Sequence, residues 1–250
     1  LKAPDGGVRR GEMGVGAGIV FDSDPVDEFA ECRLKARFLT GLANEFELFE
    51  TMRVSGDGCD HLALHLARLE KSAAYFGLAF DRAAAEALMG AQARAGETTR
   101  VRLALRQDGS MAVQSASLAP LPEPVALLLA DDATHSDDIF LRHKTSVRTR
   151  YDAAWRNAEA NGAFDTLFFN ERGELTEGGR CNVFVQLDGN WLTPPLSGGV
   201  LPGVMRSVLL ADPAWNASER VITREMLDRA TQLVVCNALR GPLRAVLKAG

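Results

Sequence analysis

Alternating apolar and polar positions predict strands in the first half of the chain. Residues 99–106 alternate between aliphatic and arginine side chains, and the turn signal Asp108-Gly109 leads into a second strand from Met111. An earlier strand is predicted over 46–54, before the turn-forming run Ser-Gly-Asp-Gly at 55–58. The arginines therefore belong to the polar face of a half-buried hairpin and do not indicate a nucleic-acid patch.

Helical spacing of apolar residues predicts two helices between these strands. One begins at a capping Asp60 and runs to about residue 76, and a second is capped by Asp81 and runs to about residue 95. The apolar residues of the first helix recur every three or four positions: Leu62, Leu66, Leu69, Ala73 and Phe76.

A stretch with three prolines at 119–124 predicts a linker to a second lobe. Beyond it, the pattern predicts helices over 146–160 and from Gly203, and strands over 125–130, 164–169, 182–187, 191–193, 233–236 and 243–247. The chain is therefore expected to be an α+β protein, with a small lobe at 43–121 and a large lobe at 122–250.

Residues 1–42 are expected to be a separate leader. A short buried strand is predicted at 19–21, followed by a helix to about residue 40 that is capped by Ser23 or Asp24. The chain does not begin with Met and shows no secretory signal, so it looks like a piece of a longer protein.

Composition narrows the class of protein. A net charge of -5 and a pI near 5.5 disfavour nucleic-acid binding, and no apolar run reaches the length of a membrane span. The four cysteines are widely spaced without a CxxC pair, which favours reduced thiols and a cytoplasmic location.

Several familiar site motifs are incomplete or missing. His61 and His65 have the spacing of a helical metal pair, but no third ligand is evident, so structural histidines are the better interpretation and no metal is expected. The glycines at 14, 16 and 18 do not complete a dinucleotide fingerprint. Phosphate-loop and nucleophile-elbow motifs are absent.

The remaining candidates for chemistry are a lysine and a glutamate. Lys144 precedes a predicted helix, and Glu177 follows 33 positions later in the run Leu-Thr-Glu-Gly-Gly-Arg-Cys-Asn-Val-Phe at 175–184. Taken singly, such a lysine is usually solvated and such a glutamate usually lies in a surface turn. The pair gains weight only from the segments around it.

Those segments resemble the class IV aminotransferase family, the fold type IV enzymes that use pyridoxal 5'-phosphate (PLP). Five of them match in family order, at 49–53, 65–69, 143–145, 177–184 and 201–206. The resemblance implies a two-lobed fold like that of D-amino acid aminotransferase, a homodimer, and a cofactor held covalently by Lys144. It further implies cofactor contacts from Glu177 at the ring nitrogen and, at the phosphate and elsewhere, from Arg68, Asn182, Val204, Met205, Asn237 and Ala238.

The roles implied for these residues agree with the chemistry of the cofactor. A carboxylate beside the pyridine nitrogen keeps it protonated, and the protonated ring is the stronger electron sink. A phosphate dianion is favoured by the free N–H groups of a helix start and by a fixed guanidinium such as that of Arg68.

Within the family, the runs 48–53 and 236–241 look like those of the 4-amino-4-deoxychorismate lyases, which release pyruvate to give 4-aminobenzoate for folate synthesis. Lys144 would then be anchor and base, Thr51 would protonate or position the leaving group, and Arg53 and Arg240 would bind substrate carboxylates. A branched-chain or D-amino acid aminotransferase is the alternative.

The leader is similar to the closing strand and helix of chorismate-utilising enzymes such as aminodeoxychorismate synthase component I. The resemblance implies a fusion in which the synthase domain precedes the lyase. One departure is that the strand pair which usually opens the family's first lobe is missing here, so the small lobe is expected to be trimmed.

Overall fold

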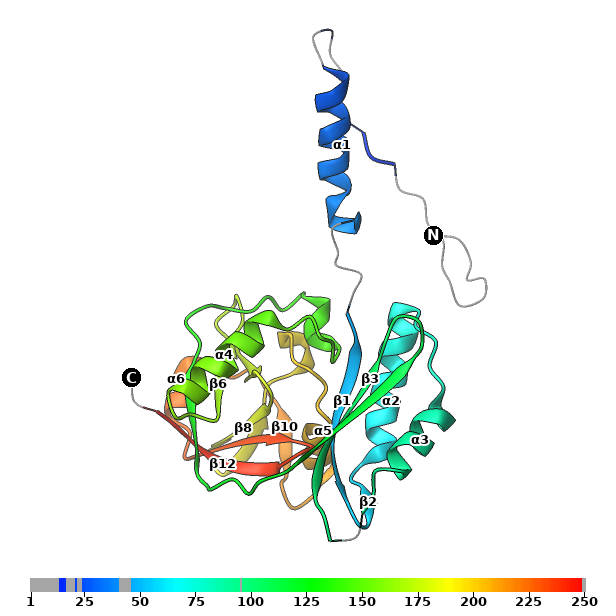
Figure 1. Cartoon of the computed structure of the whole chain (residues 1–250). Helices are drawn as coiled ribbons and strands as arrows, with labels where there is room; N and C mark the ends of the chain where they lie inside the picture. Colours follow the sequence, from blue (N-terminus) through cyan, green and yellow to red (C-terminus); the bar gives the residue numbers. More distant parts are fainter. Residues whose placement is uncertain (1–13, 17–20, 22–23, 41–45, 95, 249–250) are drawn as a thin grey trace.

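The computed structural model describes residues 14–16, 21, 24–40, 46–94 and 96–248. Two lobes lie side by side, with strand β1 (Leu48–Ser55) running between them (Figure 1). The first lobe holds a four-stranded sheet and the second an eight-stranded sheet. The strands of the first sheet lie between residues 48 and 117, and those of the second lie between residues 125 and 247.

The small lobe is an antiparallel sheet covered by helices on one face. Its order is β2-β1-β3-β4, with β2 at Gly58–Cys59, β3 at Thr99–Leu105 and β4 at Met111–Ser117. Alternate residues of β1 pack into a core with α2 (Leu62–Phe76) and α3 (Arg82–Gly90). Because side chains alternate along a strand, Phe49, Thr51 and Arg53 lie on the opposite face of the sheet.

The helix starts of this lobe differ in one respect from the predicted ones. Asp81 accepts a hydrogen bond from the backbone N–H of Ala84 at 3.0 Å, so it caps α3 as expected. The prediction of Asp60 as the cap of α2 is wrong, because His61 occupies that position in a left-handed conformation with φ of 55°. The αL residue turns the chain sharply from β2 into the helix.

The large lobe is a mixed sheet with helices on both faces. Its order is β10-β9-β8-β11-β12-β5-β6-β7, and three of its neighbouring pairs are parallel: β9 with β10, β5 with β12 and β5 with β6. The strands span Val125–Leu129 (β5), Asp165–Phe169 (β6), Leu175–Gly178 (β7), Asn182–Leu187 (β8), Asn190–Thr193 (β9), Ala217–Glu219 (β10), Gln232–Asn237 (β11) and Gly241–Leu247 (β12).

Three helices complete this lobe: α4 (Thr149–Ala160), α5 (Val204–Ala211) and α6 (Arg224–Asp228). One face of β8 and β11 packs into the main core with Leu227 of α6, and the other packs on Met205 and Leu209 of α5. Short 3-10 turns at Ile139–Arg142 and Leu196–Gly198 precede α4 and α5. The pattern had not predicted β7, β10 or α6.

The segment that carries Lys144 is bonded to the small lobe although it belongs to the large one. The carbonyl of Lys144 accepts from the N–H of Phe49 at 3.0 Å, and the N–H of Ser146 donates to the carbonyl of Glu47 at 2.9 Å. His143 contacts the ring of Tyr75 on α2, with ring centroids 4.5 Å apart. These contacts fix the position of Lys144 against β1.

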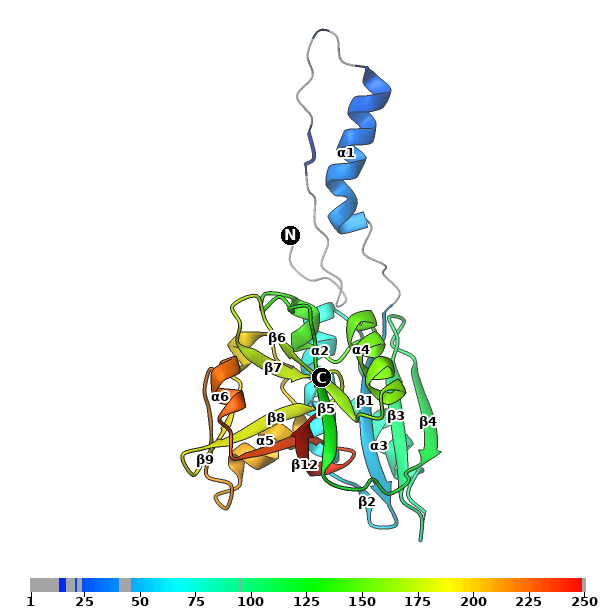
Figure 2. The same ribbon diagram turned by 90° about the vertical axis from the view of Figure 1, so that its left-hand side faces the viewer.

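The leader contains one described helix. Helix α1 spans Pro25–Thr40 and stands away from both lobes in the two ribbon views (Figures 1 and 2). The carboxylate of Asp24 accepts from the N–H of Val26 at 2.7 Å, as expected of the helix cap. Of the predicted strand, residues 19 and 20 lie outside the described residues, and Phe21 is exposed in a turn instead of being buried. No helix among the described residues has the length and apolar character of a membrane span.

Candidate active site

Lys144 places its amine in the interior, at the seam between the lobes. Its Nζ lies 4.8 Å from the ring centroid of Phe49, on the face of β1 that looks away from α2. Burial, together with the positive charges of Arg68 and Arg148, lowers the pKa of Lys144 from 10.5 to about 7. A buried amine that is partly unprotonated near neutral pH is suited to act as a nucleophile or a base.

Glu177 lies at the edge of the large sheet in β7, with its carboxylate buried. Its Oε1 accepts from the hydroxyl of Tyr151 at 3.1 Å, and its Oε2 accepts from the side chain of Asn182 at 3.0 Å and the N–H of Leu201 at 3.1 Å. Burial raises its pKa from 4.5 to about 7, and these bonds and the charge of Lys144 oppose the rise. The charges of Lys144 and Glu177 thus act on each other.

The turn after Glu177 is held by a second buried carboxylate. Asp165 accepts from the N–H groups of Gly179 at 3.1 Å and Arg180 at 2.9 Å, and from the thiol of Cys181 at 3.0 Å. A Cβ at Gly178 would lie 2.7 Å from Asp165 Oδ2 and 2.6 Å from the sulfur of Cys181. The close fit explains the glycine and keeps Glu177 in a fixed orientation.

Arg68 projects from α2 toward the start of α5. Its Nε donates to Glu50 Oε1 at 2.8 Å, and its Nη1 donates to the carbonyl of Pro202 at 3.0 Å. Glu50 also accepts from Nδ1 of His65 at 2.7 Å. Although burial alone would raise the pKa of Glu50, the charge of Arg68 and the hydrogen bonds outweigh it and lower that pKa to about 2.

Asn182 connects the glutamate with the helix start. Its amide donates to Glu177 and to the carbonyl of Leu201 at 3.1 Å. A Cβ at Gly203, the residue before α5, would lie 1.8 Å from Asn182 Oδ1. Val204 and Met205 follow as the first buried residues of α5, and the first-turn amides of a helix have no acceptor within it.

We call Lys144, Arg68, Arg148, Glu50 and Glu177 the charged cluster. Arg148 is also paired with the partly exposed Asp152, with Nε 2.7 Å from Oδ1. The N–H groups of Arg68 that are not engaged by Glu50 and Pro202 therefore form the part of the cluster that favours an anionic ligand.

Three further predicted residues lie on β1 and in the turn after β11. Thr51 is half-buried on the Phe49 face of β1, and Arg53 follows on the same face with its side chain 46% exposed. Burial and the charge of Arg53 lower the pKa of Arg240, so guanidinium groups of the two lobes act on each other. Arg53 also lies 3.9 Å from the carboxylate of Asp60, and Arg240 donates to the carbonyl of Ala119.

Asn237 and Ala238 lie at the turn between β11 and β12. The side chain of Asn237 donates to the carbonyl of Arg180 at 3.2 Å and accepts from the N–H of Arg240 at 2.9 Å. Ala238 follows in the turn itself. Asn237 therefore links the turn after Glu177 to the position of Arg240.

Sequence reasoning missed Arg148 and Tyr151 in this region. The guanidinium carbon of Arg148 lies 5.9 Å from the ring centroids of both Phe49 and Tyr151, and its Nη2 donates to the carbonyl of Gly179. Arg148 is the residue before α4, and Tyr151 lies in the first turn of that helix. No local sequence pattern marks either residue.

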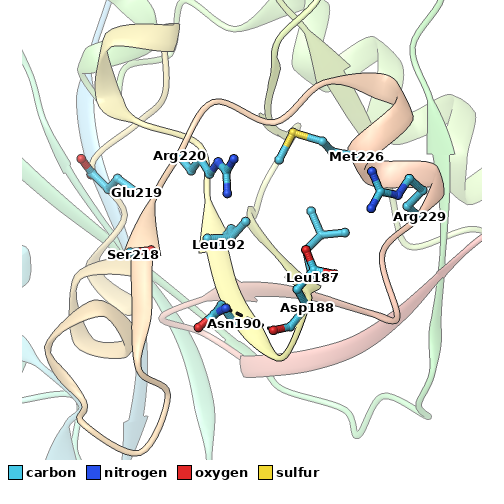
Figure 3. Close-up of a pocket in the computed structure, with 9 residues that line it drawn as sticks. All are labelled: Leu187, Asp188, Asn190, Leu192, Ser218, Glu219, Arg220, Met226 and Arg229. Atoms are coloured by element: carbon cyan, nitrogen blue, oxygen red, sulfur yellow. Dashed lines mark hydrogen bonds between the residues drawn. The ribbon is translucent and has the colours of Figure 1, made fainter.

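A surface hollow lies elsewhere in the large lobe. A cavity of about 330 Å³ among β9, β10 and α6 is lined by aliphatic side chains and by polar ones such as Arg220 and Arg229 (Figure 3). It contains no member of the charged cluster. Within the described part of the chain, no group of three or more His, Cys, Asp or Glu side chains is arranged to hold a metal.

Gly203→Ala tests the packing between Asn182 and the start of α5. The added methyl group must displace Asn182, so we expect a loss of about 1–3 kcal/mol in the free energy of unfolding, measured with urea. Gly90→Ala at the end of α3 is the matched control, because its Cβ meets no atom within 4 Å. Equal stability of the two variants would contradict the tight fit.

The pKa of Lys144 predicts its reactivity. Above a pH of about 7 its amine should be unprotonated, so acetylation of the protein by trace acetic anhydride should reach half its maximum near that pH. Arg148→Met should move this midpoint upward, because a positive charge is removed. Peptide mapping with the exposed Lys71 as internal reference measures both; a midpoint near 10.5 in the unaltered protein would contradict the buried amine.

Two family models match this chain. Residues 47–246 match the model of the family described as amino-transferase class IV, and residues 5–41 match that described as chorismate binding enzyme. A Schizosaccharomyces pombe protein provisionally named aminodeoxychorismate lyase is 27% identical over 209 residues, which are 81% of this chain and 90% of that protein.

Solved structures extend the comparison. A Mesorhizobium loti protein provisionally named an amino-acid aminotransferase is 39% identical, with a TM-score of 0.72, and the match covers 81% of this chain and all (100%) of that one. A hypothetical aminotransferase from Mycobacterium tuberculosis in its PLP-bound form shares the fold at 20% identity and a TM-score of 0.66, over 84% of each chain. The two lobes thus form the fold type IV architecture, and over residues 47–246 the chain belongs to the class IV amino-transferase family.

Proposed function

We propose that this protein is a PLP-dependent 4-amino-4-deoxychorismate lyase. The observation that carries the proposal is the charged cluster, in which a buried amine of pKa about 7 and a buried carboxylate share one site with two arginines. Such a site can bind a molecule with a carbonyl at one point, a basic nitrogen at another and a phosphate at a third.

The residues present fit PLP. Arg68 and the first amides of α5 at Val204 and Met205 would hold the phosphate. Glu177, fixed by three hydrogen-bond donors, would face the ring nitrogen. Asn182 would keep these two ends at a constant separation, because it bonds to Glu177 and to Leu201. Asn237 and Ala238 would border the cofactor from the β11–β12 turn.

When bound, PLP supplies a ring that withdraws electrons from the carbon bearing the substrate's amino group. Glu177 would hold a proton on the ring nitrogen, because an ionised carboxylate stabilises the adjacent positive charge. Lys144 would anchor the cofactor through its amine and, once displaced by the substrate amine, would remove the proton from C4 of the substrate. Its lowered pKa favours the unprotonated form that this step requires.

Loss of the C4 proton is followed by breakage of the bond between C3 and the enolpyruvyl oxygen. Thr51 lies on the same face of β1 as Phe49, which contacts Lys144, and is the candidate to protonate or position the departing group. The products are 4-aminobenzoate and pyruvate, and aromatisation of the ring favours their formation. Arg53 and Arg240 would bind the substrate carboxylates from the two lobes.

Two comparisons support the lyase over other members of the family. The relative from Schizosaccharomyces pombe carries a lyase name, and the segment at 5–41 resembles enzymes that bind chorismate. A synthase domain fused before the lyase would make the lyase's substrate on the same polypeptide. A homodimer and a cytoplasmic location, where folate precursors are made, complete the proposal.

The alternative is an aminotransferase acting on branched-chain or D-amino acids. It is favoured by the name given to the Mesorhizobium loti structure, which is 39% identical. The charged cluster would serve both reactions, so only the substrate separates them. We therefore expect pyruvate release from aminodeoxychorismate and no keto acid formation from leucine or D-alanine with 2-oxoglutarate; the reverse result would establish the aminotransferase.

Lys144→Ala tests the anchor directly. The unaltered protein incubated with PLP and reduced with borohydride should carry the cofactor on the peptide containing Lys144, as located by mass spectrometry. The variant should lose this adduct and at least about 10³-fold of its lyase turnover, since anchor and base are removed together. Lys71→Ala, at an exposed position on α2, is the control and should keep both. Full activity of Lys144→Ala would end the assignment.

A further inference from the structure

The spacing of His65 from His61 is that of a helical metal pair. In the structure, His65 instead lies beside Glu50, a member of the charged cluster. The side chain is fully buried, and its Nδ1 lies 2.7 Å from Glu50 Oε2. Because an ionised carboxylate only accepts, Nδ1 must carry the proton. Within the described residues Nε2 meets no hydrogen-bond partner, which fits a neutral ring with its lone pair at Nε2.

The two carboxylate oxygens of Glu50 accept three hydrogen bonds. Oε1 accepts from Arg68 Nε at 2.8 Å, and Oε2 accepts from Arg68 Nη2 at 2.5 Å and from His65 Nδ1. The guanidinium is thus bound in the two-pronged manner that fixes its plane as well as its position. His65 and Arg68 thus share the acceptor Oε2.

Arg68 keeps part of its hydrogen-bonding capacity for a ligand. A guanidinium carries five N–H groups, and three are engaged, two with Glu50 and one with the carbonyl of Pro202. The other two are directed by this fixed plane beside the start of α5. Without Glu50 the side chain would be free to rotate about its several single bonds, and the two groups would lose their common direction.

We propose that His65 and Glu50 are positioning residues that orient Arg68, and that they set the preference of the site for a phosphate-bearing ligand over the same ligand without phosphate. This rests on the proposed function, in which Arg68 binds the cofactor phosphate. Neither His65 nor Glu50 contacts the ligand; both act through the guanidinium.

The geometry shows why glutamine cannot replace Glu50. An amide has one oxygen and one NH₂ group, and each oxygen position of Glu50 receives an N–H of Arg68. Whichever way the amide turns, its NH₂ group meets a donor of the arginine. Glu50→Gln therefore breaks one of the two hydrogen bonds between residue 50 and Arg68. It also removes a negative charge that opposes the binding of a phosphate.

The test compares pyridoxine 5'-phosphate with pyridoxine, which differ only in the phosphate and form no bond with Lys144. The dissociation constant of pyridoxine divided by that of pyridoxine 5'-phosphate reports the phosphate preference alone. Both constants are measured on the cofactor-free protein by calorimetry. We expect this ratio to fall about tenfold or more in Glu50→Gln and His65→Leu, as for loss of a hydrogen bond to a charged group. His65→Asn, whose amide can donate near the position of Nδ1, should restore most of it.

His61→Asn and Glu70→Gln are matched controls, because both positions are exposed on or beside α2, and both should keep the unaltered ratio. Equal weakening of both ligands in Glu50→Gln and His65→Leu would show a purely structural role and overturn the proposal. A higher ratio in Glu50→Gln would overturn it too, because Glu50 would then only oppose the phosphate charge. If one variant fails to fold, the other decides.

The same measurements distinguish a failure of the proposed function from a failure of this inference. An unaltered protein that shows no preference for the phosphate form would remove the phosphate site, and this inference with it. A phosphate preference that persists unchanged in both variants leaves the proposed function intact and rejects only the roles of His65 and Glu50.

Discussion

Burial of the Lys144 amine at the seam between two lobes is the constraint on which the site depends. Desolvation of the amine, together with the charges of Arg68 and Arg148, disfavours its protonated form and lowers its pKa to about 7. The same burial would be too costly for an isolated charge, and the neighbouring carboxylates of Glu50 and Glu177 offset part of the cost. Arg68, which lies beside the start of α5, is the cation of the cluster that suits an anionic cofactor.

Backbone contacts make this burial possible. The lysine belongs to the large lobe, but its carbonyl is bonded to Phe49 in the small lobe, and Ser146 is bonded to Glu47. Arg68 adds a second connection across the seam through the carbonyl of Pro202. Because both lobes contribute to one cluster, a change in their relative position would alter the chemistry of the lysine and the orientation of the arginine together.

The sequence predicted much of this and missed the parts that depend on tertiary contacts. The periodic strands and helices around 99–117 and 62–76 lie where expected, since apolar spacing determines them locally. A glutamate in a glycine-rich run, taken singly, usually lies in a surface turn, and only the family resemblance indicated a site role for Glu177. It lies buried in β7, and Asp165 accepts from the N–H groups of the turn that follows. His61 replaced Asp60 at the start of α2, and Arg148 joined the cluster, through contacts that no local pattern encodes.

A crystal structure of the protein with PLP tests the central claim most directly. The account predicts continuous density from Lys144 Nζ to the cofactor's aldehyde carbon, with the Glu177 carboxylate within hydrogen-bond distance of the ring nitrogen and the phosphate beside Arg68 and the first turn of α5. A cofactor bound at another place, or a Glu177 side chain turned away from the ring nitrogen, would contradict it.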